Sequence, residues 1–169
     1  MNKKIETEPH TYGSAAPDGV SAVPETFGVW TVSRALRNGK WVAAVTQHKT
    51  ARGPQKAAVA IDIVPVGNGR ATGMLILPFG LRLATGVSLK VDSQRVSYAF
   101  PFATALPIGC MAALDLDEAL IGSLRAGSVL KIAAGLYETG RTAVFQLSLE
   151  GFVSAYARAI ELSGTSKQS

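Results

Sequence analysis

The chain has 169 residues, of which 47% are hydrophobic and 17% charged, so it can bury the core of one domain and is too apolar for the disordered class. Lys, Asp, Gly or Pro interrupts the longest apolar runs well before the roughly 18 residues that a membrane-spanning helix requires. The net charge of +5 favours anionic partners, and the single cysteine, Cys110, excludes an intramolecular disulfide without indicating a compartment.

The two ends of the chain are polar and show no hydrophobic periodicity. Residues 1–26 contain scattered charges, prolines and glycines, which are typical of a flexible leader, and residues 164–169 form a polar tail. The sequence between them, 27–163, is predicted to be a single β-rich domain. No apolar stretch follows the charged start of the chain, so no signal peptide is visible. Either the protein stays inside the cell or an export signal has been removed.

Hairpins organise the first part of this domain. Asn38-Gly39 separates two segments of alternating apolar and polar residues, which is among the strongest short signals for a β-hairpin. The turns at 67–70 and 92–94 predict a second and a third hairpin. With the later segments of the same kind, the pattern predicts about nine strands, at residues 28–35, 41–47, 57–64, 71–77, 87–91, 95–100, 108–114, 128–133 and 142–149.

Two short helices are predicted in the rest of the domain. Asp115 can cap the first, with Glu118 three residues later completing a capping box, and Gly127 closes it. The second spans about 151–162, and one of its faces carries Phe152, Tyr156, Ala159 and Ile160. Because no βαβ alternation is present, we expect a mainly β fold, an antiparallel β-sandwich or partly closed barrel of about nine strands with two short α-helices.

A basic segment is the clearest candidate for a binding surface. No acidic residue occurs between Glu25 and Asp62. The segment contains six cationic residues, Arg34, Arg37, Lys40, Lys49, Arg52 and Lys56. It can be a solvated hairpin face or a patch that binds a protein partner or an anionic surface, such as lipid head groups or an acidic polymer. Only Trp30 and Trp41 are interleaved with the cations, so the segment contains no specific nucleic-acid motif.

The sequence shows no arrangement of residues that catalysis or metal binding would require. His10 lies in the leader and His48 in the basic segment, and neither has a second histidine or a cysteine at metal-ligand spacing. Cys110 follows Gly109 in an apolar strand, so we expect a buried, inert thiol. Helix capping explains the one carboxylate cluster, Asp115, Asp117 and Glu118. We therefore predict no catalytic residue, no metal ligand and no cofactor, and a protein that is not an enzyme.

Four segments resemble the invasion-associated locus B family. They are Leu-Pro-Phe-Gly-Leu-Arg-Leu-Ala-Thr-Gly-Val-Ser-Leu-Lys-Val-Asp at 77–92, Pro-Ile-Gly-Cys-Met-Ala at 107–112, Leu-Ser-Leu-Glu-Gly-Phe-Val-Ser-Ala-Tyr at 147–156, and Phe-Gly-Val-Trp-Thr-Val at 27–32. No single piece is specific, but their order and spacing together are, and the resemblance covers roughly residues 27 to 162.

The resemblance implies a non-enzymatic, β-rich protein of the Gram-negative cell envelope, exported to the periplasm or the outer membrane and associated with host-cell invasion. We expect a binding or accessory protein, with a structural accessory subunit of a larger membrane or envelope assembly as the alternative. An export segment upstream of this numbering is also expected. A cytoplasmic location is the alternative, because no signal peptide and no paired cysteines are present.

The chain departs from the family pattern in its cysteines. Family members usually carry three further cysteines at places that are filled here by Ser33, by Ala43 or Ala44, and by Ala105. Cys110 is then an unpaired remnant. Each lost disulfide removes roughly 2–4 kcal/mol, which apolar packing must offset.

Overall fold

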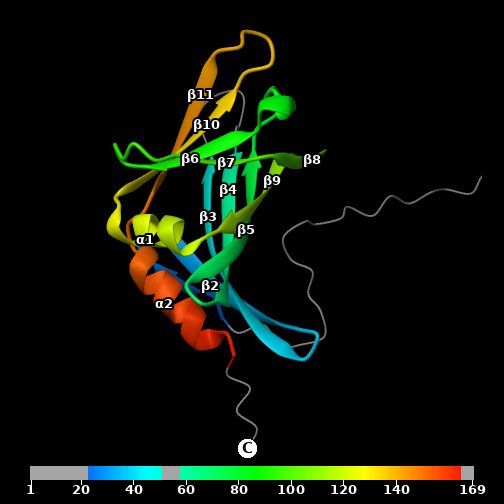
Figure 1. Cartoon of the computed structure of the whole chain (residues 1–169). Coiled ribbons are helices and arrows are strands. Elements are labelled where there is room, and N and C mark those ends of the chain that lie inside the picture. Colours follow the sequence, from blue (N-terminus) through cyan, green and yellow to red (C-terminus); the bar gives the residue numbers. More distant parts are fainter. Residues whose placement is uncertain (1–22, 51–57, 165–169) are drawn as a thin grey trace, which may run out of the picture.

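The computed structural model describes residues 23–50 and 58–164, which form two antiparallel β-sheets and two α-helices (Figure 1). The larger sheet has seven strands in the order β1-β2-β3-β4-β5-β9-β8, and the smaller has four in the order β11-β10-β6-β7. The elements are β1 (Glu25–Phe27), β2 (Trp30–Arg37), β3 (Lys40–Thr50), β4 (Ala58–Gly67), β5 (Arg70–Leu77), the 3-10 turn η1 (Leu83–Thr85), β6 (Val87–Val91), β7 (Tyr98–Phe100), β8 (Phe102–Leu106), β9 (Gly109–Leu116), α1 (Glu118–Ala126), β10 (Val129–Gly135), β11 (Thr142–Ser148) and α2 (Phe152–Leu162).

The expected mainly β sandwich is confirmed, with eleven strands in place of about nine. Within the described residues the two sheets do not close into a barrel. The two unpredicted strands, β1 and β8, are the edge strands of the larger sheet. β1 starts at Glu25, inside the segment expected to be a leader, and its Glu25 carboxylate forms a 2.9 Å ion pair with Arg158 of α2. The hydrogen bond from that guanidinium lowers the pKa of Glu25.

The three predicted hairpins are confirmed. Asn38 and Gly39 have φ values of 51° and 73°. The two central residues of the 67–70 turn also have positive φ values, as the tight turns of twisted hairpins require. β6 and β7 pair as the third hairpin, with Val87 opposite Phe100. β4 does not end at Pro65 as predicted, because a register shift between Pro65 and Gly67 lets pairing with β5 continue.

The start of the first helix differs from the prediction. Asp117, and not Asp115, is the N-cap, since its carboxylate accepts a 2.8 Å hydrogen bond from the backbone N–H of Leu120. Asp115 remains in β9, whose pairing with β5 runs to Leu116, and forms a 2.9 Å ion pair with Arg70. The prediction chose the wrong one of two nearby aspartates because the length of β9 depends on its partner strand.

The second helix buries the predicted face except at one position. Phe152, Ala155, Tyr156 and Ala159 are buried, whereas Ile160 is 51% exposed, so the assignment of Ile160 to the packed face is wrong. Phe152 contacts Trp30 edge to face, with ring centroids 5.1 Å apart, and stacks on Tyr156 at 5.5 Å. These ring contacts fix the rotation of α2 about its axis.

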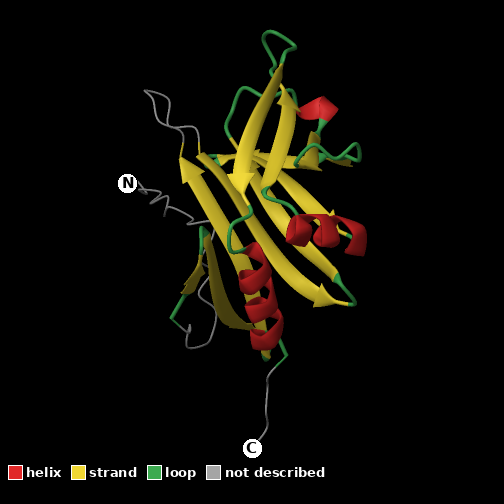
Figure 2. Ribbon diagram, turned by 90° about the vertical axis from the view of Figure 1, so that its left-hand side faces the viewer, coloured by secondary structure: helices red, strands yellow, loops and turns green. Residues whose placement is uncertain are grey.

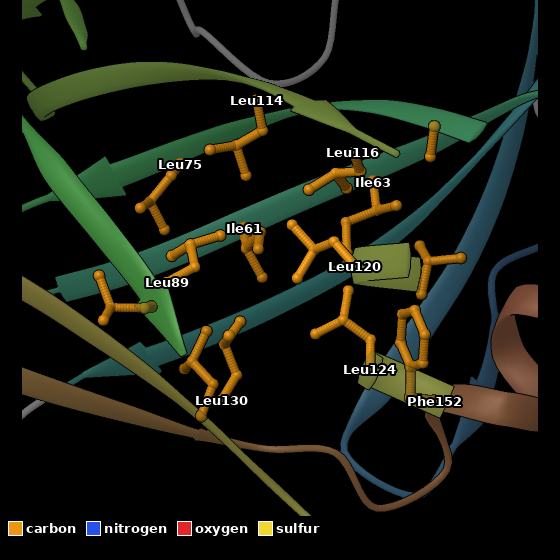
Figure 3. Close-up of a cluster of buried hydrophobic side chains, with 14 of the residues drawn as sticks. Ile61, Ile63, Leu75, Leu89, Leu114, Leu116, Leu120, Leu124, Leu130 and Phe152 are labelled. Carbon is orange, nitrogen blue, oxygen red and sulfur yellow. The ribbon is translucent and has the colours of Figure 1, made fainter. Parts of the chain in front are cut away.

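The core lies on the inner face of the larger sheet, which the smaller sheet and both helices cover (Figure 2). Leu89 and Leu130 of the smaller sheet point toward the larger sheet, and Leu120, Leu124 and Phe152 of the helices fill the space beside them (Figure 3). Alternate residues of β3, β6 and β10 enter this core, so the residues between them lie on the outer faces of the two sheets, whereas β4 and β9 also contain consecutive buried residues.

Candidate functional site

The hairpin formed by β2 and β3 projects beyond the rest of the larger sheet (Figure 1). Pairing of β3 with β4 ends at Val45, whereas pairing of β2 with β3 continues to Arg37 opposite Lys40. Within the described residues, the end of the hairpin, residues 34–42, therefore has no strand beyond β3, and we call it the hairpin tip. Next to the tip, the backbone N–H of Ala43 donates a 3.2 Å hydrogen bond to Oγ of Ser163, the residue that follows α2.

Three of the predicted site residues meet in the hairpin tip. Arg37 and Lys40 are cross-strand neighbours at its exposed end. The Arg34 guanidinium lies 4.0 Å from the ring centroid of Trp41, a cation–π contact, and Arg34 Nε is buried without a hydrogen-bond partner in the described part of the chain. Among the described residues none of the three forms an ion pair, although the charge of Arg37 acts on the Asp62 carboxylate.

The other predicted site residues do not join this cluster. Lys49 lies nine residues beyond Lys40 on β3, about 30 Å away along an extended strand. Its Nζ donates a 3.0 Å hydrogen bond to the carbonyl oxygen of Gln146 and so links the two sheets. Arg52 and Lys56 lie outside the described residues. Among the described cations of the basic segment, Arg34, Arg37 and Lys40 therefore gather in the hairpin tip and Lys49 lies apart from them.

Asp62 is a half-buried carboxylate on the outer face of the larger sheet. Thr46 and Met74 are its cross-strand neighbours. Burial raises the pKa of Asp62, and the positive charges of His48 and Arg37 oppose that shift only in part. Ionisation of Asp62 therefore costs stability, and the cost is absent below the unfolded-state pKa, grows as pH rises through the folded-state pKa and is complete above it.

Replacing Asp62 with asparagine should therefore raise the Tm at neutral pH by a few degrees and leave it nearly unchanged at about pH 3, where both states are protonated. Thermal unfolding followed by circular dichroism across this pH range measures the difference. Glu138→Gln, which removes an exposed loop carboxylate, is the control and should have little effect. A lower Tm for Asp62→Asn at neutral pH would mean that the ionised carboxylate stabilises the fold.

The candidate catalytic groups of the sequence lie apart in the structure. The predicted burial of Cys110 is confirmed at 3% exposure, and burial raises its pKa, which disfavours the reactive thiolate. Asp117 caps a helix, and His48 is exposed on the outer face of the larger sheet. His10 is outside the described residues, and the described ranges contain no group of three metal-ligating side chains.

The register of the strands relates the positions where the family pattern led us to expect cysteines. Ala105 of β8 lies directly opposite Cys110 of β9, and Ser33 of β2 lies directly opposite Ala44 of β3. Ala43 instead opposes Arg34. The structure therefore arranges the positions as two cross-strand pairs, with Ala44 as the partner of Ser33.

A second group of cations was missed in the sequence. Arg82, Lys90 and Lys131 come from three separate segments, and the structure brings them to the outer face of the smaller sheet. The alternation of β6 places Lys90 on that face. The sequence could not show that Lys131 is its neighbour, because the pairing of β6 with β10 joins segments about forty residues apart in the chain.

Comparison with known proteins identifies the family. The sequence profile of the invasion-associated locus B protein family matches residues 34–159, most of the chain. The chain belongs to the invasion-associated locus B family. The resemblance inferred from four short segments is thereby confirmed, and the matched range agrees closely with the range of that resemblance.

Relatives of the family support this assignment over nearly the whole chain. An invasion protein B homologue of Brucella abortus is 29% identical over 147 residues, which cover 87% of this chain and 84% of the relative. Invasion protein B of Bartonella bacilliformis is 26% identical over 162 residues, 95% of this chain and 86% of the relative. The names of these relatives state no enzymatic reaction.

A crystal structure supports the fold. Invasion-associated protein B from Bartonella henselae matches with a TM-score of 0.77 and 28% sequence identity, over 83% of this chain and 97% of that one. No helix in the described part of this family member is both long enough and apolar enough to cross a membrane.

Proposed function

We propose that this chain is a non-enzymatic protein of the cell envelope that binds an anionic partner through the hairpin tip. The observation that carries the proposal is the open positive charge of Arg34, Arg37 and Lys40, which project on a two-stranded hairpin beyond the sheet. The partner is an acidic protein surface or an anionic surface of lipid head groups or acidic polymer. The envelope location rests on the relatives' names, which describe them as invasion proteins.

The shape of the tip suits this role. A projecting hairpin can reach a surface without contact from the rest of the domain, and neighbouring like charges attract an anionic partner over a distance of about one Debye length, roughly 10 Å at 0.1 M salt. Trp41, whose ring lies beneath the Arg34 guanidinium, adds an amphipathic side chain that can enter an interfacial region.

Binding to vesicles that contain acidic phospholipid tests the proposal. We expect the protein to sediment with them at low salt and to lose at least tenfold in affinity at physiological ionic strength, because the attraction is screened. The double substitution Arg37→Glu and Lys40→Glu should abolish binding and leave the Tm within a few degrees of the wild type. Arg34 is left in place, since its contact with Trp41 also supports the packing of the tip.

The control is Arg95→Glu with Arg125→Glu, which makes the same change in net charge at two exposed positions outside the tip. This variant should bind nearly as well as the wild type. Equal loss in both double variants would mean that net charge alone drives the association. Binding to an acidic protein or polymer, but not to vesicles, with the same dependence on Arg37 and Lys40 would keep the site and identify the other kind of partner.

A further inference from the structure

The outer face of the smaller sheet contains a groove of about 320 Å³. Its floor is made of small residues on three neighbouring strands. Ser88 of β6 lies opposite Ala99 of β7 on one side and opposite Ala133 of β10 on the other. Because these side chains end at or just beyond Cβ, they leave a hollow that larger strand residues would fill.

The segment at 82–85 forms one wall of the groove. The backbone N–H of Arg82 donates a 2.7 Å hydrogen bond to the carbonyl oxygen of Gly135, which holds the segment beside the end of β10. A Cβ on Gly135 would lie 3.4 Å from Thr85 Oγ1, and a Cβ on Gly140 would lie 3.7 Å from an Arg82 Nη atom. The Arg82 guanidinium therefore lies against the β10–β11 loop and borders the groove.

Two lysines lie on the same face of the sheet, next to the residues that line the groove. Lys90 and Lys131 are directly opposite each other on β6 and β10, two residues beyond the floor on the same face. Like charges in this position destabilise a strand pair. Within the described ranges neither lysine nor Arg82 forms an ion pair. The carboxylate of Asp92, the residue that follows β6, does not pair with these cations. It accepts hydrogen bonds from backbone N–H groups, including a 2.9 Å bond from Val129.

Hydroxyl groups complete the lining. Ser88 and Thr142 make no side-chain hydrogen bond to another described residue, so their O–H groups are available to a ligand. The Thr85 hydroxyl donates a 3.0 Å hydrogen bond to the carbonyl oxygen of Arg82 and so fixes the bend of the wall. The groove thus combines a fixed wall, free donors and one cation in its lining with two cations beside it, and none of the three forms an ion pair within the described ranges.

We propose that this groove binds the phosphate group of a small ligand. A phosphate monoester carries a charge of about −1.5 to −2 at pH 7, which suits three cations better than a single carboxylate would. Arginine provides a fork of donors that matches phosphate oxygens, and the lysines add point charges. A volume of about 320 Å³ is at the lower end of the range for small-molecule sites. Strands β6, β7 and β10, which carry the groove residues, lie far from the end of the hairpin of β2 and β3 (Figure 1), so the proposal is independent of the function proposed for the tip.

An NMR titration of the full chain tests the proposal. Inorganic phosphate and glycerol phosphate are added at low ionic strength, with sodium chloride of equal ionic strength as the reference. We expect saturable changes in the amide shifts of residues 82–88, 131–135 and 142 and little change in the hairpin tip. The absence of saturable change with either phosphate compound, or the same changes with chloride, would overturn the proposal.

Two variants with matched controls locate the site. Arg82→Gln should weaken binding roughly tenfold or more, as expected for loss of a charge-assisted hydrogen bond. Ala133→Val should also weaken binding, because it fills the floor with a residue that suits a strand. Arg95→Gln and Ala113→Val make the same changes at exposed positions outside the groove and should bind like the wild type. Unchanged affinity in folded Arg82→Gln and Ala133→Val would contradict the proposal.

Vesicle binding distinguishes the two possible carriers of the phosphate, a soluble ligand and a lipid head group. Binding to glycerol phosphate that Arg82→Gln weakens supports a soluble phosphorylated ligand. Binding to vesicles containing phosphatidic acid that is tighter than binding to glycerol phosphate, and that Arg82→Gln weakens while Arg37→Glu with Lys40→Glu does not, supports a lipid head group in the same groove. Vesicle binding that depends only on the hairpin tip would rule out a lipid head group as the ligand of the groove and leave the soluble phosphorylated ligand.

Discussion

Replacing Phe152 with alanine should lower the free energy of unfolding by about 3–5 kcal/mol. Phe152 is fully buried at the start of α2, between the rings of Trp30 and Tyr156, so truncation leaves a cavity where three aromatic side chains meet. The loss is a large part of the total stability of a domain, which is typically about 5–15 kcal/mol. Urea unfolding followed by tryptophan fluorescence and circular dichroism measures it.

Ile160→Ala on the same helix is the matched control. It also removes a large apolar side chain, but Ile160 is 51% exposed, so we expect a loss of less than about 1 kcal/mol. The comparison also tests the rotation of α2, since the sequence pattern assigned both residues to one packed face. Similar losses in the two variants would mean that Ile160 is buried and that α2 is rotated from the orientation described.

Replacing Gly151 with alanine should cost about 2–4 kcal/mol, from left-handed backbone strain together with steric overlap. Gly151 has a φ of 85° at the N-cap of α2, and a Cβ there would overlap the carbonyl oxygen of Phe27. Next to this point, the backbone N–H of Val29 donates a 3.3 Å hydrogen bond to the carbonyl oxygen of Glu150. The substitution should therefore separate α2 from the start of β2 and be measured as a loss of Tm and of free energy of unfolding.

Gly39→Ala separates the two causes. Gly39 has a similar φ of 73° in the β2–β3 turn, but a Cβ there would have no neighbour within 4 Å among the described residues. Alanine at Gly39 should therefore cost only the backbone strain, about 1–2 kcal/mol. If the two glycine variants lose equal stability, close approach of the backbones at Gly151 contributes nothing.

The local signals in the sequence were reliable where a feature depends on adjacent residues. Asn38-Gly39 adopts left-handed φ values that few other residues accept, so the hairpin and its register could be predicted from the turn alone. The burial of Cys110 followed from the apolar strand around it. The helix start was less certain because Asp115 and Asp117 both suit an N-cap, and the extent of the β5–β9 ladder determined which of them became one.

The candidate sites depended on contacts between distant segments. The run of six cations predicted one surface, but the length of β3 separates Lys49 from the hairpin tip and places its amine on a carbonyl of β11. The groove residues Arg82, Lys90 and Lys131 give no joint signal in the sequence. They become neighbours only through the pairing of β6 with β10 and the hydrogen bond between Arg82 and Gly135.

The sequence by itself determined the family, the β-rich class, the hairpins and the approximate strand segments, because turn chemistry and alternation act between near neighbours. The tertiary structure alone determined that Ile160 of α2 is exposed, that Lys49 lies apart from the hairpin tip, and where the cations of the smaller sheet gather. Those features follow from strand register and from packing around Trp30 and Phe152, which depend on residues far apart in the chain. Short-range patterns carry no information on such pairings, since many registers are compatible with the same alternation.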